Sequence, residues 1–188
     1  MKVVIIAGAG EVGRGVAQAL IYERKNVILI DSDPDALKSA QSLECLLIAG
    51  DVMSRETLNH AGIQNAELLI MATDSDERNI LGCAFAKDHR QNMESASGEM
   101  VTIARVNRMS VARQDSSEVF HRWSQVDHVA NADKEIVDEL TAGLISPHIL
   151  HTAPMGNDAY LSVSKITEGS ALLGDNLINA AEKRIFFE

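Results

Sequence analysis

Three glycines near the N-terminus form the part of the sequence best suited to holding a ligand. Gly8, Gly10 and Gly13 stand between a β-branched run, Val3–Ala7, and a helical pattern. In such a turn the first glycine allows a tight bend, the second lets a phosphate approach the backbone, and the third lets strand and helix pack closely. The spacing predicts an adenine nucleotide or dinucleotide site, the alternative being a turn of the same shape without a ligand. The residues between the glycines belong to the predicted site: Ala9, Glu11 and Val12.

A carboxylate stands where such a nucleotide would place its ribose. Asp31 ends the second apolar run, about 20 residues after the first glycine, which is the usual separation for this contact. Its oxygens would accept hydrogen bonds from the ribose hydroxyls and would repel a 2′-phosphate. We therefore expect NAD(H) or ADP/ATP as the ligand and not NADP, with Ser32 beside Asp31 in the same site.

Other chemistries lack the residues that they need. A phosphate-binding loop for nucleotide hydrolysis requires Lys and Ser/Thr after the last glycine, but Arg14 and Gly15 follow. The Tyr-x-x-x-Lys pair of short-chain dehydrogenases is absent, because Tyr22 and Lys25 are three residues apart and Tyr160 and Lys165 five. The two cysteines, Cys45 and Cys83, form no thiolate zinc motif, and we expect both to be small buried hydrophobes. We predict no catalytic residues, no metal site and no enzymatic activity.

Composition and charge restrict the partners. The 188 residues are 46% hydrophobic and 23% charged, as in a globular chain. Lys and Arg number 17 against 27 Asp and Glu, a net charge of −10, which disfavours nucleic acid as a partner. Neither a cleavable signal nor an apolar run of about 20 residues is visible, so the expected compartment is the cytoplasm.

Alternating strand and helix patterns predict the frame that positions these residues. Buried apolar runs at 3–7, 26–30, 45–49, 66–72, 100–106 and 126–130 predict six strands. Helical patterns separate them, including one over about 109–123, and residues 90–99 have the composition of an exposed loop. The order predicts an α/β fold with a Rossmann-like, doubly wound, mostly parallel six-stranded sheet.

The rest of the chain predicts two further parts. An amphipathic pattern from Asn131 to about residue 145 predicts a helix that ends near Pro147. Residues 148–158 are expected to be a linker, and 160–166 a half-exposed strand. We therefore divide the chain into a nucleotide-binding domain (1–130), a crossover or dimerisation helix (131–147), and a linker with a partial small α+β subdomain (148–188).

Motifs at the ends of the later strands complete a pattern that resembles a known family. Gly50-Asp51 follows the third strand, and Ala72-Thr-Asp-Ser-Asp-Glu-Arg-Asn79 follows the fourth. Ile103-Ala-Arg-Val106 ends the fifth. Together with the glycine turn and Asp31, these motifs resemble the regulator of K⁺ conductance (RCK) domain, and most of all the TrkA-like nucleotide-binding subunits of Trk and Ktr potassium-uptake systems.

The resemblance implies further site residues at these strand ends. Asp51 and Val52 would flank the adenine, while Thr73 and Asp74 would either close the pocket or only cap the next helix. Arg105 would face the phosphates from a buried strand, and Asn79 would bind or only pack. One departure is Glu11: some Ktr-type members have an arginine there that reaches a terminal phosphate, so the choice between ATP and ADP or NAD(H) stays open.

The resemblance also implies a regulatory function. Nucleotide binding would rearrange a homodimer or larger ring, held together through 131–145, and this change would gate a membrane potassium transporter or channel. The protein would work in the cytoplasm, at the inner face of the membrane through its partner. Two alternatives are the cofactor domain of an NAD-dependent oxidoreductase and the soluble regulatory domain of a cation/proton antiporter.

Overall fold

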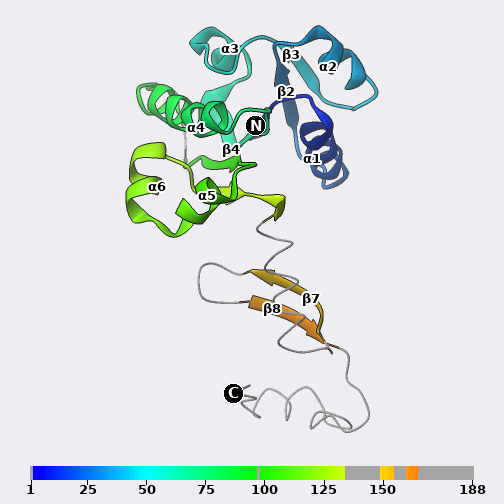
Figure 1. Ribbon diagram of the computed structural model, residues 1–188. Coiled ribbons are helices and arrows are strands. Elements are labelled where there is room, and N and C mark those ends of the chain that lie inside the picture. Colours follow the sequence, from blue (N-terminus) through cyan, green and yellow to red (C-terminus); the bar gives the residue numbers. More distant parts are fainter. Residues whose placement is uncertain (1, 97, 134–148, 155–159, 165–188) are drawn as a thin grey trace, which may run out of the picture. The chain divides into compact units, whose positions relative to one another are not determined.

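The computed structural model describes residues 2–96, 98–133, 149–154 and 160–164 (Figure 1). The chain divides into two compact units, residues 1–133 and residues 134–188. Each unit is treated by itself below. The three-part division expected from the sequence stays a prediction, because its central helix falls almost wholly outside the described residues.

A six-stranded sheet forms the centre of the first unit. Its order is β3-β2-β1-β4-β5-β6, and every pair of neighbouring strands is parallel, so the sheet is wholly and not mostly parallel. This confirms the Rossmann-like fold, because the order reverses direction beside β1. The strands are β1 (Val3–Ala7), β2 (Val27–Asp31), β3 (Leu46–Ala49), β4 (Ala66–Met71), β5 (Val101–Arg105) and β6 (His128–Ala130).

Helices cover both faces of this sheet (Figure 1). One core cluster joins the sheet to α1 and α2, and the other joins it to α3, α4 and α6. The helices are α1 (Glu11–Tyr22), α2 (Pro34–Ser39), α3 (Arg55–His60), α4 (Asp76–Gln91), α5 (Met109–Ala112) and α6 (Glu118–Ser124). Two short 3₁₀ turns, η1 (Ile63–Asn65) and η2 (Arg113–Ser116), complete the unit.

Helices α2, α3 and α4 each begin directly after a residue whose side chain accepts a hydrogen bond from a free backbone N–H group of the first turn. Asp33 accepts a hydrogen bond from Asp35 N at the start of α2, and Ser54 caps α3, both as expected. The cap of α4 is Ser75, whose hydroxyl accepts from Arg78 N at 3.2 Å. Capping by Thr73 or Asp74 is therefore wrong, since both precede the helix and stand at the end of β4.

The single helix expected over 109–123 is also wrong. The segment breaks into α5, η2 and α6. The break is held by contacts with the β6 region: Asp115 accepts a hydrogen bond from Val129 N, and the ring of His121 lies between the carbonyl oxygens of Asp115 and Val126. Tertiary hydrogen bonds of this kind override the local helical pattern.

The exposed loop expected at 90–99 is wrong at its first two residues, which belong to a helix. Helix α4 continues to Gln91, and Arg90 is buried. The Arg90 guanidinium donates to the carbonyl oxygens of Ile63 and Gly98, so it ties the loop to the end of α3 and η1. The remaining described residues of the segment are mostly exposed, although Met93 packs against the core.

The two cysteines differ in their surroundings. Cys83, on α4, is fully buried, and burial raises the pKa of its thiol to about 12. Cys45, just before β3, is half-buried and not buried as expected. Burial also raises the pKa of the Cys45 thiol, but Cys45 stays in contact with solvent.

In the second unit the described residues form an antiparallel pair, β7 (Ile149–Pro154) with β8 (Tyr160–Ser164). The strand expected at 160–166 is confirmed over 160–164. The linker expected over 148–158 is wrong at 149–154, because these residues form β7. The helix expected from Asn131 lies outside the described residues beyond Asp133. In the part of the chain that the structure describes, no helix is long and apolar enough to cross a membrane.

Candidate nucleotide site

A cavity of about 510 Å³ opens at the carboxyl edge of the sheet. The strands are parallel, so their carboxyl ends share this edge, and the change of strand order between β1 and β4 makes a crevice there. The volume is in the range of small-molecule sites. Seventeen residues contribute to the wall: Ala7, Gly8, Gly10, Glu11, Val12, Ile30, Asp31, Ser32, Asp33, Ala36, Gly50, Val52, Ala72, Thr73, Asp74, Arg78 and Arg105.

The three glycines of the turn have different surroundings. Gly8 has a φ of +107°, and a Cβ there would lie 2.7 Å from the carbonyl oxygen of Ala72. At Gly13 a Cβ would lie 1.8 Å from the carbonyl oxygen of Gly8. At Gly10 a Cβ would meet no protein atom within 4 Å, and this residue lines the cavity. The fold therefore requires Gly8 and Gly13, whereas only a ligand would require Gly10.

Asp31 stands at the end of β2 and faces the glycine turn. Its Oδ2 accepts a hydrogen bond from Ala9 N at 2.6 Å, and its Oδ1 accepts from Asp33 N at 2.9 Å. A carboxylate has about four acceptor positions, so each oxygen keeps one for a ligand hydroxyl. The carboxylate thus both fixes the turn and lines the cavity.

On the other side of β1, a network built on Asn79 shapes the wall. The Asn79 side chain is fully buried. Its oxygen accepts from Thr73 N at 3.0 Å and from Thr73 Oγ1 at 2.6 Å, while its nitrogen donates to the carbonyl oxygens of Thr73 and Arg105. One side chain therefore joins α4 to the ends of β4 and β5. Arg105 is half-buried, not buried, and lines the cavity.

An ion pair crosses from β3 to α4 at the rim of the cavity. The Arg78 guanidinium donates to Asp51 Oδ1, which also accepts from Met53 N at 2.8 Å. Burial opposes ionisation, but the Met53 N–H and the Arg78 guanidinium hold the pKa of the Asp51 carboxyl below its usual range. Asp51 is thus ionised and bound to Arg78 near neutral pH.

Most of the predicted site residues line one cavity. The exceptions are Ala9, Gly13, Asp51 and Asn79. Each exception instead holds a cavity residue in place, through the turn, the ion pair or the Asn79 network. Whether any of these residues contacts a nucleotide stays a prediction.

Seven cavity residues were missed: Ala7, Ile30, Asp33, Ala36, Gly50, Ala72 and Arg78. Ala7, Ile30 and Ala72 directly precede the predicted residues Gly8, Asp31 and Thr73. Gly50 and Asp33 lie next to predicted site residues, so the rule that strand ends line the crevice would have identified them as well. Ala36 and Arg78 lie on the first turns of helices that follow strand ends. For these two, only the rule that helix starts line such a crevice offers a signal.

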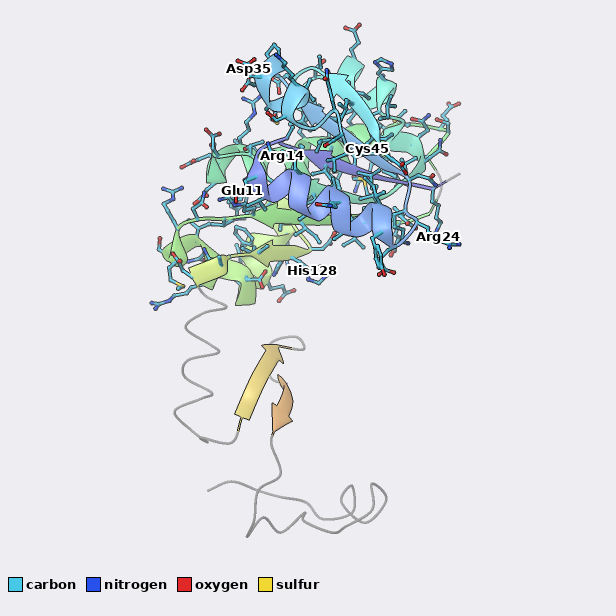
Figure 2. The ribbon with its side chains drawn as sticks, turned by 90° about the vertical axis from the view of Figure 1, so that its right-hand side faces the viewer. Glu11, Arg14, Arg24, Asp35, Cys45 and His128 are labelled. Carbon is cyan, nitrogen blue, oxygen red and sulfur yellow. The ribbon has the colours of Figure 1, made fainter. Side chains whose placement is uncertain are left out.

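Charges of both signs surround the cavity. The acidic residues of the wall are Glu11, Asp31, Asp33 and Asp74, and its cations are Arg78 and Arg105. Figure 2 shows Glu11 and Arg14 on the first turn of α1; Arg14 Nη1 donates to the carbonyl oxygen of Ala9 at 2.7 Å. Among the described residues, His, Cys, Asp and Glu form no group of three that could hold a metal ion.

The fold and this cavity define a Rossmann-like domain of the TrkA-N type. Residues 4–132 match the model of the TrkA-N domain family, and the chain belongs to that family.

Two relatives show the range of similarity. The chain is 28% identical over 176 residues to "Trk system potassium uptake protein TrkA" of Haemophilus influenzae, which covers 93% of this chain and 37% of the relative. It is 43% identical over 107 residues to "Trk system potassium uptake protein trkA homolog 1" of Methanosarcina mazei, covering 57% of this chain and 25% of that protein. The chain therefore spans well under half of these relatives.

Solved structures show the same fold. The TrkA-N domain of the inner membrane protein ybaL from Escherichia coli matches with a TM-score of 0.61 and 14% identity, covering 77% of this chain and 96% of that one. GsuK bound to ADP matches with a TM-score of 0.58 and 22% identity, covering 76% and 33%. The GsuK channel bound to NAD matches with a TM-score of 0.56 and 17% identity, covering 72% and 22%.

Proposed function

We propose that this chain is the regulatory nucleotide-binding part of a potassium-transport system. An adenine nucleotide binds in the cavity, favours one arrangement of a homodimer or ring, and so gates a membrane potassium transporter or channel. A ligand shifts such an equilibrium only by the difference between its affinities for the two arrangements. The protein acts on the cytoplasmic side, at the inner face of the membrane through its partner.

Sequence similarity supports a role in potassium transport, and the cavity supports a nucleotide as the ligand. Relatives that align with 93% of this chain at 28% identity, or with 57% of it at 43% identity, carry the name of Trk potassium uptake proteins. The observation that carries the proposal is Gly10, a glycine over the cavity that no protein contact explains. A phosphate group held by the start of α1 would need that space.

A Gly10→Val variant tests the ligand directly. Gly10 has φ −66° and ψ −173°, extended values that valine adopts without strain, so the fold should persist. The added side chain would fill the phosphate position, and we expect ADP and NADH binding by calorimetry to fall at least a hundredfold. The variant should lose only about 1 kcal/mol in the free energy of unfolding in urea, because valine is a poorer N-cap residue than glycine but meets no packed group here.

A control variant accompanies this experiment. Gly15→Ala also adds a side chain in open space, but further along α1, at a residue that does not line the cavity. It should bind both nucleotides as the wild type does. Equal binding by the Gly10 and Gly15 variants, or no binding by the wild type, contradicts the proposal.

The proposed ligands are NAD(H) and ADP or ATP, without NADP. Asp31 supports the exclusion, because a 2′-phosphate would meet a carboxylate already held in place by two backbone N–H groups. Glu11 lines the cavity at the start of α1, where a third phosphate would meet its charge. We therefore expect ADP and NADH to bind more tightly than ATP in the absence of divalent cations.

We propose a regulator and not an enzyme. The motifs for ATP hydrolysis and for hydride transfer are missing from the sequence. Purified protein should neither oxidise NADH nor turn over ATP at a rate that follows the protein through purification. A steady rate that disappears in the Gly10→Val variant would favour the oxidoreductase alternative.

A further inference from the structure

Buried polar side chains gather at the carboxyl end of β5. Among the described residues six polar side chains are buried, and three of them bond to the stretch from Arg105 to Arg108. These three are Asp76 and Asn79, near the start of α4, and Asn131, just after β6. A buried polar group is costly unless it is hydrogen-bonded, and a bonded one fixes the geometry of the groups around it. The position of this stretch is therefore set by directional bonds as well as by apolar packing.

On one side, the stretch is bonded to α4 and to the wall of the cavity. Asn79 Nδ2 donates to the carbonyl oxygen of Arg105 at 2.8 Å, and its Oδ1 accepts from Thr73 N. Asp76 Oδ1 accepts from Asn107 N at 2.7 Å. Thr73 and Arg105 both line the cavity. A ligand that moves either wall residue would therefore also move this stretch.

On the other side, the same stretch is bonded to Asn131. The Asn131 side chain is 3% exposed, and its Nδ2 donates to the carbonyl oxygens of Val106 at 2.6 Å and Asn107 at 3.2 Å. The backbone adds a second link, because Val106 N donates to the carbonyl oxygen of Ala130 at 2.9 Å. Among the described residues, none from β6 onward lines the cavity. The contact of β6 with the site therefore runs through β5, its neighbour in the sheet.

Asn131 also stands at a junction in the chain. Residues 132 and 133 are helical, so Asn131 directly precedes a helix start, where asparagine is among the preferred residues. The second compact unit begins at Lys134. The side-chain nitrogen of Asn131 is thus bonded to the end of β5, while its backbone leads into the rest of the chain.

We propose that Asn131 is a positioning residue that couples the nucleotide cavity to the chain that follows it. This rests on the proposed nucleotide-binding function and names the residue through which binding acts on residues 134–188. An occupied cavity fixes Thr73 and Arg105, Asn79 extends this order to the stretch after β5, and Asn131 extends it to the helix start. Hydrogen-bonded networks between rigid elements can carry such coupling, which by linkage acts equally in both directions.

Hydrogen exchange measured with and without ADP tests this coupling. In the wild type, saturating ADP should change exchange in residues 134–188 by about fivefold or more, the lower end of the usual coupling between two sites. Asn131→Ser and Asn131→Asp keep a side chain suited to a helix start but lack the Nδ2 donor. Calorimetry should show that both variants bind ADP no more weakly than the wild type. The response of residues 134–188 to ADP should be lost in both.

Ser124→Ala is the matched control. Ser124 is also fully buried, and its Oγ accepts from Val126 N at 3.2 Å, but it lies before β6, at the amino end of that strand. This variant should lose stability and keep the full response to ADP. Loss of the response in Ser124→Ala as well would identify a general effect of destabilisation and overturn the role of Asn131.

Other outcomes also overturn the coupling. One is a response that persists in both Asn131 variants, and another is a loss of ADP binding by both, because Asn131 would then support the cavity itself. A wild type that binds ADP without a change in residues 134–188 removes the coupling and leaves nucleotide binding in place. If the wild type binds no ADP, the proposed function itself fails.

Discussion

Asp31 has two tasks that a single substitution can separate. Its oxygens hold Ala9 N and Asp33 N, and they are also the expected partners of a ribose. Asp31→Asn keeps one acceptor oxygen but removes the charge. We expect NADH affinity to fall by about 1.5–3 kcal/mol, the cost of losing hydrogen bonds to a charged group.

Asp31→Asn should also change the selectivity between NADH and NADPH. Without the carboxylate a 2′-phosphate is no longer repelled, so the affinity for NADPH relative to NADH should rise. Titration of both cofactors against wild type and Asp31→Asn measures the ratio. An unchanged ratio would show that Asp31 does not face the ribose.

Among single residues, those at strand ends could be assigned to the site from the sequence, whereas the cavity residues on the first turns of α2 and α4 could not. Gly8, Asp31 and Thr73 lie at or just after strand ends, so their place at the sheet edge comes from the parallel order alone. Arg78 enters the wall through a long side chain and an ion pair with Asp51. Such a contact between distant segments has no periodic or local signal in the sequence.

His121 gives the α6 region a dependence on pH. The carbonyl oxygen of Val126 faces one ring nitrogen and that of Asp115 faces the other, so a doubly protonated ring satisfies both. The hydrogen bond to Val126 raises the pKa of His121 above its usual range, against the opposing effect of burial and with help from Asp115 and Asp127.

A raised folded-state pKa means that the stabilisation is complete below the unfolded-state pKa and is lost as the pH rises through the folded-state pKa. We expect the free energy of unfolding in urea to fall as the pH rises from about 6 to about 8, around the ordinary histidine pKa. His121→Gln should flatten this part of the profile. His128→Gln is the control, because His128 is exposed on β6. Equal slopes in His121→Gln and wild type would refute the assignment.

Among the elements, the junction of β4, α4 and β5 depends most on one side chain. Removing the Asn79 amide takes away the side-chain partner of Thr73 N and of the Arg105 carbonyl oxygen, and it leaves the Thr73 carbonyl oxygen with only Arg105 Nη1 at 3.5 Å. We expect Asn79→Ala to lower the free energy of unfolding by about 3 kcal/mol. Chemical denaturation measures this. Asn59→Ala, which removes an exposed hydrogen bond to His89, should cost under about 0.5 kcal/mol. Similar losses in both variants would contradict the role given to Asn79.

The sequence pattern predicted the buried strands correctly, but it failed for segments whose secondary structure depends on contacts with distant residues. The continuous apolar runs of β1 and β2 are typical of strands inside a covered parallel sheet, and β4 departs from this pattern only at Glu67. The 109–123 segment has a helical pattern, but Asp115 and His121 are fixed to the β6 region and break it. At 148–158 the breaks expected from proline and Gly156 suggested a linker, yet Pro154 pairs opposite Tyr160 at the end of the β7–β8 pair.

For the whole molecule, the assembly expected through 131–145 stays a prediction. The apolar stripe of this segment includes Leu140, and charged residues such as Glu139 would lie at the rim of a contact. Light scattering of wild type should give at least a dimer at tens of micromolar, roughly the range of ordinary assays. Leu140→Asp should shift the mass toward the monomer, and Glu139→Gln should not. A monomeric wild type would remove the proposed path from nucleotide to transporter.

The contrast between the two thiols makes the natural chain suitable for site-specific labelling. At pH 7 a thiol with a pKa of about 12 is ionised in only about one molecule in 10⁵, and Cys83 is also shielded from solvent. Cys45, half-buried beside the edge strand β3 and marked in Figure 2, would therefore take a maleimide or spin label first. In a symmetric assembly each copy would carry one label at the same position. The distance between labels, followed with and without nucleotide, would then report the rearrangement of subunits without any engineered cysteine.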